Sequence, residues 1–520
     1  MLRSRASVSL MGSAYEKRTD RCNNLLAMVA QKWKWGTLAA VCLAQLVLML
    51  DVTVVIVALP DISRDLGGDL ADVQFVVDIY ALALAALLLN FGALADRVGR
   101  RRVFLAGLAI FGVASVLCAI ASSTAVLIGA RGVQGAGGAM LFATGLALLG
   151  NAYRGGDRAK ALGVFGAVFG AAVALGPLVG GLVLEAADWR WIFFINIPVV
   201  VAGTWLAFAY VEESLDPDPR AVDIPGQLTF ALSIGSLVVA LVKGQELGWG
   251  SATIVGLFAI AAAALLLFVA IETRRESPMF DLALLADRSF SGAALAAFAT
   301  SASLFGMFVY LTIWFQRVQG MDALEAGLKL LPVTLLAFIA AALAGRLSGR
   351  IPPRPILALA LASTATGLLQ MTTLGPADSW TVALPGLLLC GLGFGLANPT
   401  VASVTLTVAP PERSATAIGM NSTFRQVGVA TGVAVLGAVF DSALGGLVAR
   451  LGDSDAGAAV IQLPPEAQAA FTDALDNVFV TGAGIAAVGA LLAALLVNAP
   501  PSAGDLPDGP SPSVAEGRDI

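Results

Sequence analysis

Long apolar stretches separated by short polar loops constrain this chain more than any other feature. A helix needs about 20 apolar residues to cross the hydrocarbon core of a bilayer. Only 13% of the residues are charged, whereas a soluble domain usually has about 25%. The sequence therefore predicts an all-α polytopic membrane protein. We expect fourteen transmembrane helices, at 35–59, 74–94, 103–121, 125–150, 159–184, 191–210, 225–243, 252–271, 291–316, 326–348, 355–373, 380–408, 414–440 and 476–497.

Basic residues predict the orientation of these helices. If the N-terminus is cytoplasmic, 23 Lys and Arg residues fall on the cytoplasmic side and six on the opposite side. Because cytoplasmic loops carry the excess of positive charge, we expect an N-in/C-in topology with an even number of helices. Residues 1–34 then form a cytoplasmic N-terminal tail. Residues 498–520, rich in Pro, Gly, Ser and Asp, form a cytoplasmic tail that we expect to be disordered.

Two segments of the chain are similar to each other. Residues 92–105 read GALADRVGRRRVFL and residues 345–358 read GRLSGRIPPRPILA, with Gly349 where the first copy has Asp96. Internal repeats with a site at their interface are typical of secondary transporters. We therefore expect an N-terminal six-helix bundle at 35–210, two inserted linker helices at 225–271 and a C-terminal six-helix bundle at 291–497. The longest connection is expected at 441–476.

Charged residues inside the predicted spans are the first candidates for chemistry, because each is costly to insert into a membrane. At 1.5 Å per residue, Asp51, Arg131 and Asp78 lie about 12, 9 and 6 Å from the outer ends of their spans. An acid and an arginine at one depth can share a cavity and shift each other's proton affinity. The chain has no histidine, so proton coupling must use Asp or Glu. Two alternatives stay open: Asp78 as a boundary residue, and Arg425 as a structural partner for a backbone carbonyl.

The loop after the second predicted span places one acid among four cations. It reads Gly92-Ala-Leu-Ala-Asp96-Arg97-Val-Gly99-Arg100-Arg101-Arg102. A positive-inside anchor explains the arginines but requires neither the acid nor the glycine spacing. The loop resembles the signature loop of the major facilitator superfamily, in which such residues latch the cytoplasmic side and release as the carrier turns inward. The resemblance assigns this latch to Gly92, Asp96, Arg97, Gly99 and Arg101.

Three further motifs resemble parts of the same family. Arg131 and Gln134 match its R-x-x-Q-G motif, which is associated with proton transfer. The fifth span resembles the antiporter motif of the exporter branches, although small-residue packing is the alternative; the matching residues are Gly170, Gly176, Pro177, Gly180 and Gly181. The first span, around Leu50-Asp51-Val-Thr53, and the phrase DWRWIFFINIP at 188–198 resemble the fourteen-helix drug:proton antiporter branch.

The resemblance implies a secondary active transporter in the cell (inner or plasma) membrane that exports amphiphilic organic compounds in exchange for protons. Its partners would be the substrate, protons and the lipid bilayer, without nucleic acid, and the chain would be a monomer. We expect no enzyme activity, no metal, no cofactor and no ATP, because the chain has no phosphate-binding loop. The alternatives are a metabolite or lipid exporter, an uncoupled carrier, or a non-transporting membrane sensor. The candidates for lining a substrate cavity are Gln134, Arg425, Phe142, Phe305, Phe308, Trp314 and Phe394.

Overall fold

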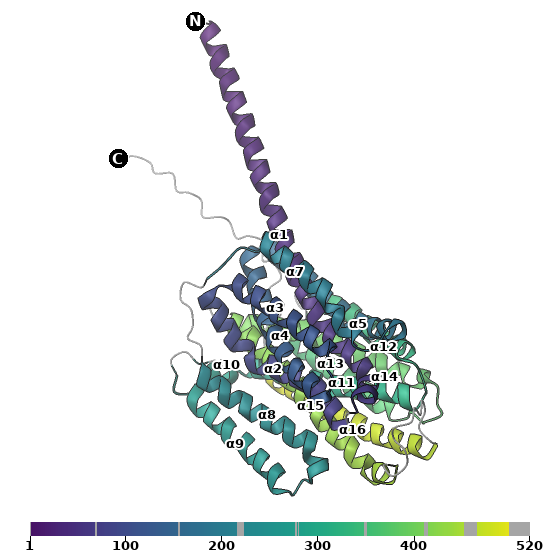
Figure 1. Ribbon diagram of the computed structural model, residues 1–520. Helices are drawn as coiled ribbons and strands as arrows, with labels where there is room; N and C mark the ends of the chain where they lie inside the picture. Colours follow the sequence, from purple (N-terminus) through teal and green to yellow (C-terminus); the bar gives the residue numbers. More distant parts are fainter. Residues whose placement is uncertain are drawn as a thin grey trace. The chain divides into compact units, whose positions relative to one another are not determined.

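The chain folds into helices only. A computed structural model describes residues 2–67, 70–153, 156–215, 223–275, 278, 280–347, 351–409, 414–451 and 465–498. Every regular element within these ranges is a helix (Figure 1), which confirms the predicted all-α class. Gly349 of the second repeat copy and the tail after residue 498 lie outside the described residues.

The chain divides into two compact units, residues 1–232 and 233–520, with the boundary inside helix α8. The division into bundles at 35–210 and 291–497 stays a prediction. The helices that begin in the first unit are α1 (Leu2–Leu66), α2 (Leu70–Val98), α3 (Arg100–Ala119), α4 (Thr124–Ala152), α5 (Gly156–Ala186), α6 (Trp191–Phe194), α7 (Asn196–Tyr210) and α8 (Ile224–Leu247). Those of the second unit are α9 (Ala252–Glu272), α10 (Leu282–Ala286), α11 (Arg288–Arg317), α12 (Ala323–Leu347), α13 (Pro353–Met371), the short 3₁₀ helix η1 (Trp380–Val382), α14 (Leu384–Val408), α15 (Ser414–Leu451) and α16 (Pro465–Leu496).

Local chemistry explains several helix boundaries. The Ser123 hydroxyl accepts the Val126 amide at the start of α4, and the Asp287 carboxylate accepts the Phe290 amide at 2.9 Å at the start of α11. Such caps satisfy amides that have no partner within the helix. Gly99 separates α2 from α3 with a φ of 121°, which a residue with a side chain rarely adopts.

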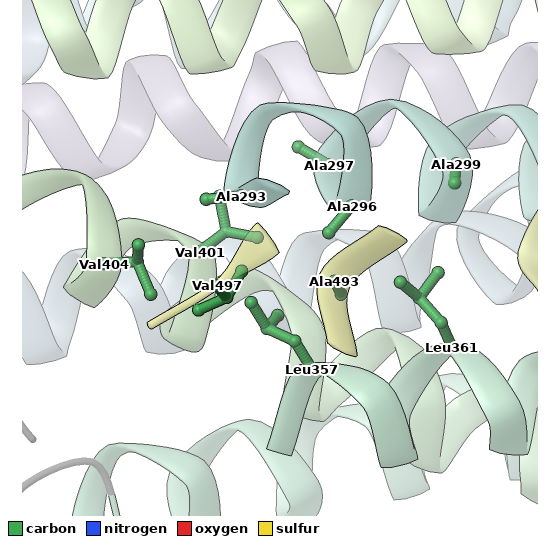
Figure 2. Close-up of a cluster of buried hydrophobic side chains, with 10 residues drawn as sticks. All are labelled: Ala293, Ala296, Ala297, Ala299, Leu357, Leu361, Val401, Val404, Ala493 and Val497. Carbon is green, nitrogen blue, oxygen red and sulfur yellow. The ribbon is translucent and has the colours of Figure 1, made fainter. Parts of the chain in front are cut away.

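Helix α1 is central to the first unit, where it packs against α5 and α7, while α4 packs against both α2 and α3. In the second unit, α11 packs against α15 and α16, and α13 packs against α14 and α16. Figure 2 shows the core where α11, α13, α14 and the end of α16 meet. It is made of small and branched apolar side chains, namely Ala293, Ala296, Ala297, Ala299, Leu357, Leu361, Val401, Val404, Ala493 and Val497.

Glycines bring helices of the second unit into close backbone contact. A Cβ added at Gly367 would lie 2.6 Å from the carbonyl oxygen of Gly386. A Cβ at Gly432 would overlap the backbone of Ala302. Close approach of this kind is how helices associate in a bilayer, where lipid offers no hydrophobic drive between them.

Twelve helices of the described chain are long and apolar enough to cross a membrane. They correspond to twelve of the predicted spans. The two remaining predictions, at 159–184 and 355–373, coincide with α5 and α13. Helix α13 begins Pro353-Arg354-Pro355 and ends Gln370-Met371, so its polar ends lower its hydropathy. The count of fourteen and the N-in/C-in topology stay predictions.

Several helices extend beyond or divide the predicted spans. Helix α1 already begins at Leu2, so the backbone of the predicted tail 1–34 is largely helical. Helices α15 and α16 reach Leu451 and Pro465. The predicted long connection at 441–476 was therefore wrong in extent, because its Ala-rich flanks are good helix formers. The span at 191–210 forms two helices, α6 and α7, separated at Ile195.

The helices of the inserted pair, α8 and α9, are joined to each other and to neighbouring elements by polar contacts. The Ser233 hydroxyl of α8 donates to the Ala261 carbonyl of α9 at 2.9 Å. The buried Asn90 amide of α2 donates to the Asp223 carbonyl at 3.0 Å, directly before α8. At the other end, a Glu272 carboxylate oxygen accepts the Phe280 amide at 3.1 Å.

Candidate functional site

Asp51 is a carboxylate buried in the apolar part of α1. The residue is 1% exposed, and its surroundings on the helix, from Val47 to Leu50 and from Val54 onward, are apolar. A charge in such a place is costly unless it is paired and hydrogen-bonded. The partners of Asp51 therefore define the site.

Arg131 of α4 is the ion-pair partner of Asp51. Its guanidinium binds Oδ2 of Asp51, and both side chains are almost fully buried. Nε of Arg131 donates to the Val76 carbonyl of α2 at 3.1 Å, and Cζ lies 4.3 Å from the centre of the Tyr80 ring. A carboxylate, a carbonyl and an aromatic face thus surround the cation. The two residues that the sequence placed at one depth are in direct contact.

Gln134 completes the link between α4 and Asp51. One turn after Arg131, its Oε1 accepts from Arg131 Nη1 at 2.6 Å, while its Nε2 donates to Asp51 Oδ1 at 2.8 Å. Nε2 also donates to the Ser115 hydroxyl of α3 at 2.9 Å. The spacing of three residues places both side chains of the R-x-x-Q pattern on one helix face. Gln134, predicted as a cavity residue, is therefore part of the Asp51 cluster.

Asn196 and Ser115 are members of this cluster that sequence reasoning did not assign. Nδ2 of Asn196, at the start of α7, donates to Asp51 Oδ1 at 2.8 Å and to Ser115 Oγ at 3.3 Å. Asn196 is 1% exposed and Ser115 is fully buried. The available signal was a single amide inside the apolar phrase WIFFINIP, because polar residues within spans need partners. We call Asp51, Ser115, Arg131, Gln134 and Asn196 the Asp51 cluster.

Asp78 of α2 is fully buried, and neither of its carboxylate oxygens has a hydrogen-bond partner among the described residues. It follows Val76, whose carbonyl binds Arg131, by two residues. No hydrogen bond joins Asp78 to Asp51 or Arg131 in the described part of the chain. Asp78 is therefore a second buried acid on the helix beside the cluster, and not one of its bonded members.

The glycines of the predicted antiporter motif bring α5 against α1 next to Asp51. A Cβ added at Gly176 would overlap the Thr53 hydroxyl, and one at Gly180 would lie 3.3 Å from the Val54 carbonyl oxygen. Gly181 is buried as well. The side-chain surroundings of Gly170 and Pro177 lie outside what the structure describes. The motif therefore packs onto the turn of α1 that follows the carboxylate.

The predicted latch residues have different partners. Asp96 binds Arg100, with Nε and Nη2 each 2.9 Å from Oδ1. Arg101 donates to the Phe208 carbonyl of α7 at 2.9 Å, and its guanidinium lies over the Phe208 ring. Arg97 is exposed, and a Cβ at Gly92 would meet only ordinary contact, 3.9 Å from Ala143. Sequence reasoning missed Arg100 as the partner of Asp96, although a spacing of four residues joins them.

Glu213, just after α7, is a further residue of this loop that the sequence did not reveal. Its carboxylate accepts the Arg101 amide at 3.0 Å and lies 3.7 Å from the Arg102 guanidinium. A Cβ at Gly99 would lie 2.6 Å from the same carboxylate. A negative charge at a helix N-terminus is favourable, so Glu213 fastens the start of α3 to the end of α7.

The remaining candidates lie mostly within packed helices. Trp314 is fully buried and donates its Nε1 to the Thr472 hydroxyl at 3.0 Å, which indicates a packing role. The Phe305 and Phe308 rings lie 6.4 Å apart in an edge-to-face arrangement. Phe142 and Phe394 are buried on α4 and α14, and Arg425 is partly exposed on α15. Their role as substrate contacts stays a prediction.

The Asp51 cluster joins one buried acid to one buried cation. The ionised acid and Arg131 cancel in charge, so one added proton changes the net charge of a buried cluster. Among the described residues, no three His, Cys, Asp or Glu side chains are grouped so that they could hold a metal ion. The chemistry of the cluster is therefore that of a buried acid with an arginine partner.

Comparisons with known proteins identify the family of the chain. A family model described as Major Facilitator Superfamily matches residues 41–433. The multidrug resistance protein Stp of Mycobacterium tuberculosis is 37% identical over 405 residues, 78% of this chain and 75% of its own. The tetracenomycin C resistance and export protein of Streptomyces glaucescens is 32% identical over 451 residues, 86% of this chain and 83% of its own.

A solved structure shows the same fold. A bacterial homologue of the human lysosomal transporter Spinster, in an inward-facing and unoccupied conformation, has a TM-score of 0.60 at 17% identity. The match covers 89% of this chain and 97% of that one. The apolar helices and the family match identify a multi-span membrane transporter. The chain belongs to the major facilitator superfamily.

Proposed function

We propose that this chain exports amphiphilic organic compounds, such as drugs, antibiotics or secondary metabolites, in exchange for protons. The observation that carries the proposal is the buried Asp51–Arg131 ion pair, held by Gln134 and Asn196. A buried ion pair rarely adds stability over apolar residues of the same size. Ionisable residues inside membrane spans therefore usually serve function.

Proton binding at Asp51 supplies a physical link between the proton gradient and the conformation. The cluster is neutral while Asp51 is ionised. Protonation leaves the Arg131 charge uncompensated in a buried place, and an unpaired buried charge costs several kcal/mol. The protonated protein therefore favours a conformation in which Arg131 reaches water or another acid. Asp78, on the helix that already binds Arg131 through Val76, is the acid that we assign to this role.

The relatives and the first-unit packing support the cargo class and the direction of transport. Two relatives are named for multidrug resistance and for resistance with export. The Gly176 contact with Thr53 places the motif typical of exporters against α1, two residues from Asp51. If protonation of Asp51 shifts this turn of α1, the shift acts directly on α5, because the two helices are in contact there. That connection supports export coupled to proton entry.

The remaining features of the proposal concern the setting of the transporter. We propose fourteen membrane spans, formed by the twelve qualifying helices together with α5 and α13. The N- and C-termini are cytoplasmic, and the chain is a monomer in the cell membrane. The proton gradient drives it, without ATP, a metal or another cofactor.

Asp51→Asn tests the proposal most directly. In everted membrane vesicles energised by respiration, the variant should lose proton-coupled dye efflux, because the amide cannot take up a proton. Substrate-induced proton release, followed with a pH-sensitive dye, should be lost in parallel. Asp473→Asn, which neutralises an exposed acid on α16, is the control and should transport normally. Full efflux by Asp51→Asn in energised vesicles would contradict the proposal.

The same vesicles separate the alternative functions. An uncoupled carrier would equilibrate the dye after the gradient is collapsed, and an importer would accumulate substrate in cells. A membrane sensor would show no flux in proteoliposomes. The substrate class is tested by expression in a pump-deficient bacterial host, followed by a susceptibility screen. The compound panel of this screen includes lipids and self-made metabolites as well as drugs.

A further inference from the structure

Asn196 is the residue of the Asp51 cluster with an unused hydrogen-bonding atom. Its Nδ2 donates to Asp51 Oδ1 at 2.8 Å and to Ser115 Oγ at 3.3 Å. Its Oδ1 is buried and has no hydrogen-bond partner among the described residues. Buried polar atoms are nearly always hydrogen-bonded, so such an exception in a working site calls for a reason.

All the hydrogen bonds of the ionised Asp51 carboxylate come from donor groups of its neighbours. Oδ2 binds the Arg131 guanidinium, while Oδ1 accepts from Gln134 and Asn196. An ionised carboxylate is an acceptor only, and a protonated one must also donate. Addition of a proton to Oδ1 therefore places a new O–H against two N–H groups. The protonated acid needs an acceptor that the ionised acid did not use.

Among the described members of the cluster, Asn196 Oδ1 is the acceptor that is not already engaged. Gln134 Oε1 accepts from Arg131 at 2.6 Å, and the Cys118 thiol lies 3.7 Å from it. The Ser115 hydroxyl donates to the Phe111 carbonyl at 2.8 Å and accepts from both amides. Rotation of the Asn196 carboxamide by 180° exchanges Oδ1 and Nδ2. After the rotation Oδ1 accepts from the protonated acid, and the longer Nδ2–Ser115 bond of 3.3 Å is given up because the Ser115 hydroxyl already donates to Phe111.

We propose that Asn196 is a positioning residue that holds Asp51 in both protonation states, as a donor to the carboxylate and, after rotation of its amide, as an acceptor from the acid. The inference rests on the proposed role of Asp51 as the proton carrier. The charged and titratable groups that face Asp51 are Arg131 of α4, Tyr80 of α2 and Cys118 of α3. Helix α5 presents Gly176 to the neighbouring turn of α1. The Tyr80 hydroxyl is also buried without a hydrogen-bond partner among the described residues, but no hydrogen bond joins it to Asp51, whereas Asn196 is already bonded to the carboxylate.

Infrared difference spectra of the full-length protein between low and high pH test this inference. The wild type should show a carboxylic acid band that is missing in Asp51→Asn. In Asn196→Leu, which can neither donate nor accept, this band should move to higher frequency because the acid loses its acceptor. Proton-coupled efflux should fall at least about tenfold, since hydrogen bonds to charged groups are among the stronger ones in proteins.

The control is the same substitution in the second unit. Asn421 of α15 is also buried, donates to the Thr405 hydroxyl and has an unpartnered Oδ1. Asn421→Leu should leave the Asp51 band in place, even where it lowers stability. Asn196→Ala removes the same groups with less volume, and provides the measurement if the leucine variant does not fold.

The outcomes distinguish this inference from the proposed function. An acid band at the wild-type frequency in the Asn196 variants would overturn the role of Asn196 and leave the role of Asp51 intact. A wild-type spectrum without any band that depends on Asp51 would instead overturn the proton-carrier role. In wild-type protein with ¹³C-labelled asparagine side chains, a pH-dependent carboxamide band that is absent in Asn196→Ala would support the rotation, and an unchanged labelled spectrum would contradict it.

Discussion

The two units of this transporter differ in the kinds of side chain that they bury. In the first unit, buried Asp51, Asp78 and Arg131 lie on three apolar helices. In helices α11 to α16, the buried polar side chains among the described residues are neutral, such as Thr405 and Asn421. The core there consists of Ala, Leu and Val (Figure 2). The helices around Asp51 therefore bury charge, whereas helices α11 to α16 combine neutral polar side chains with close apolar packing.

Under the proposed function, this difference assigns proton coupling to the first unit. Close packing through Gly367, Gly386 and Gly432 fixes helices to each other and is insensitive to protons. In the proposed mechanism the Asp51 cluster responds to protons, because one added proton would change its net charge. We therefore expect substitutions of equal cost in stability to have unequal effects on transport in the two units.

Removal of Arg131 should have the largest effect. Arg131→Leu leaves Asp51 buried without its counter-charge, and loss of one partner of a buried pair costs about 3–5 kcal/mol in free energy of unfolding. Adding Asp51→Asn to Arg131→Leu should recover most of that loss, since both charges are then absent. Thermal unfolding in detergent measures the stability. Proton-coupled efflux should be absent in both variants.

The matched variant in the second unit is Leu361→Ala. Leu361 is fully buried in the core of Figure 2, and such a truncation costs about 2–5 kcal/mol. The number of protons exchanged per substrate should stay that of the wild type, measured in proteoliposomes at a temperature where the variant is folded. If Leu361→Ala uncouples transport, or if the double variant still couples it, the comparison between the units fails.

Gly176→Ala should have an intermediate effect. Its Cβ would overlap the Thr53 hydroxyl, so α5 and α1 must move apart, and overpacking of this kind costs about 1–3 kcal/mol. Because this contact follows Asp51 by two residues, efflux should fall by more than the loss of folded protein explains. Efflux per folded molecule, with folding measured by size-exclusion chromatography, is the readout.

Two controls make the Gly176 result specific. Gly166 lies on the same helix, and a Cβ there would meet no neighbouring atom within 4 Å. Gly166→Ala should be neutral or slightly stabilising, because Ala is the better helix former. Gly432→Ala, which overlaps Ala302 in the second unit, should destabilise without changing efflux per folded molecule. Equal losses of specific efflux at Gly176 and Gly432 would speak against a special role of the first unit.

Glu213→Gln should have the smallest effect. The amide keeps an acceptor for the Arg101 backbone but loses the charge beside Arg102. A partly exposed charge at a helix N-terminus contributes less than about 1 kcal/mol. Efflux should fall modestly and depend more on salt than in the wild type. Glu212→Gln changes the adjacent exposed acid and should have no effect. Equal effects of the two variants would contradict a specific role of Glu213 at the start of α3.

Much of the fold follows from the sequence, because hydrophobic length alone selects helices in a bilayer. Each predicted span overlaps at least one helix, with shifted ends, while the short α10 was not predicted. Depth counting placed Asp51 at the level of Arg131. The contacts of the loop between α2 and α3 were not predicted: Asp96 binds Arg100, and Glu213 binds the start of α3. Arg100 is one turn further along than Asp96, and Glu213 comes from a loop more than a hundred residues away.

The sequence by itself determined the class of protein, the helices and the two charges that need each other, because apolar length and the cost of buried charge are properties of residue type and spacing. Only the tertiary structure decided which neutral side chains complete the site. Asn196 reaches Asp51 because α7 packs against α1, and Ser115 of α3 binds the amides of Asn196 and Gln134. The sequence of an apolar helix does not fix the direction in which a single amide points. Packing between helices sets that direction, and with it the hydrogen bonds that surround the proton site.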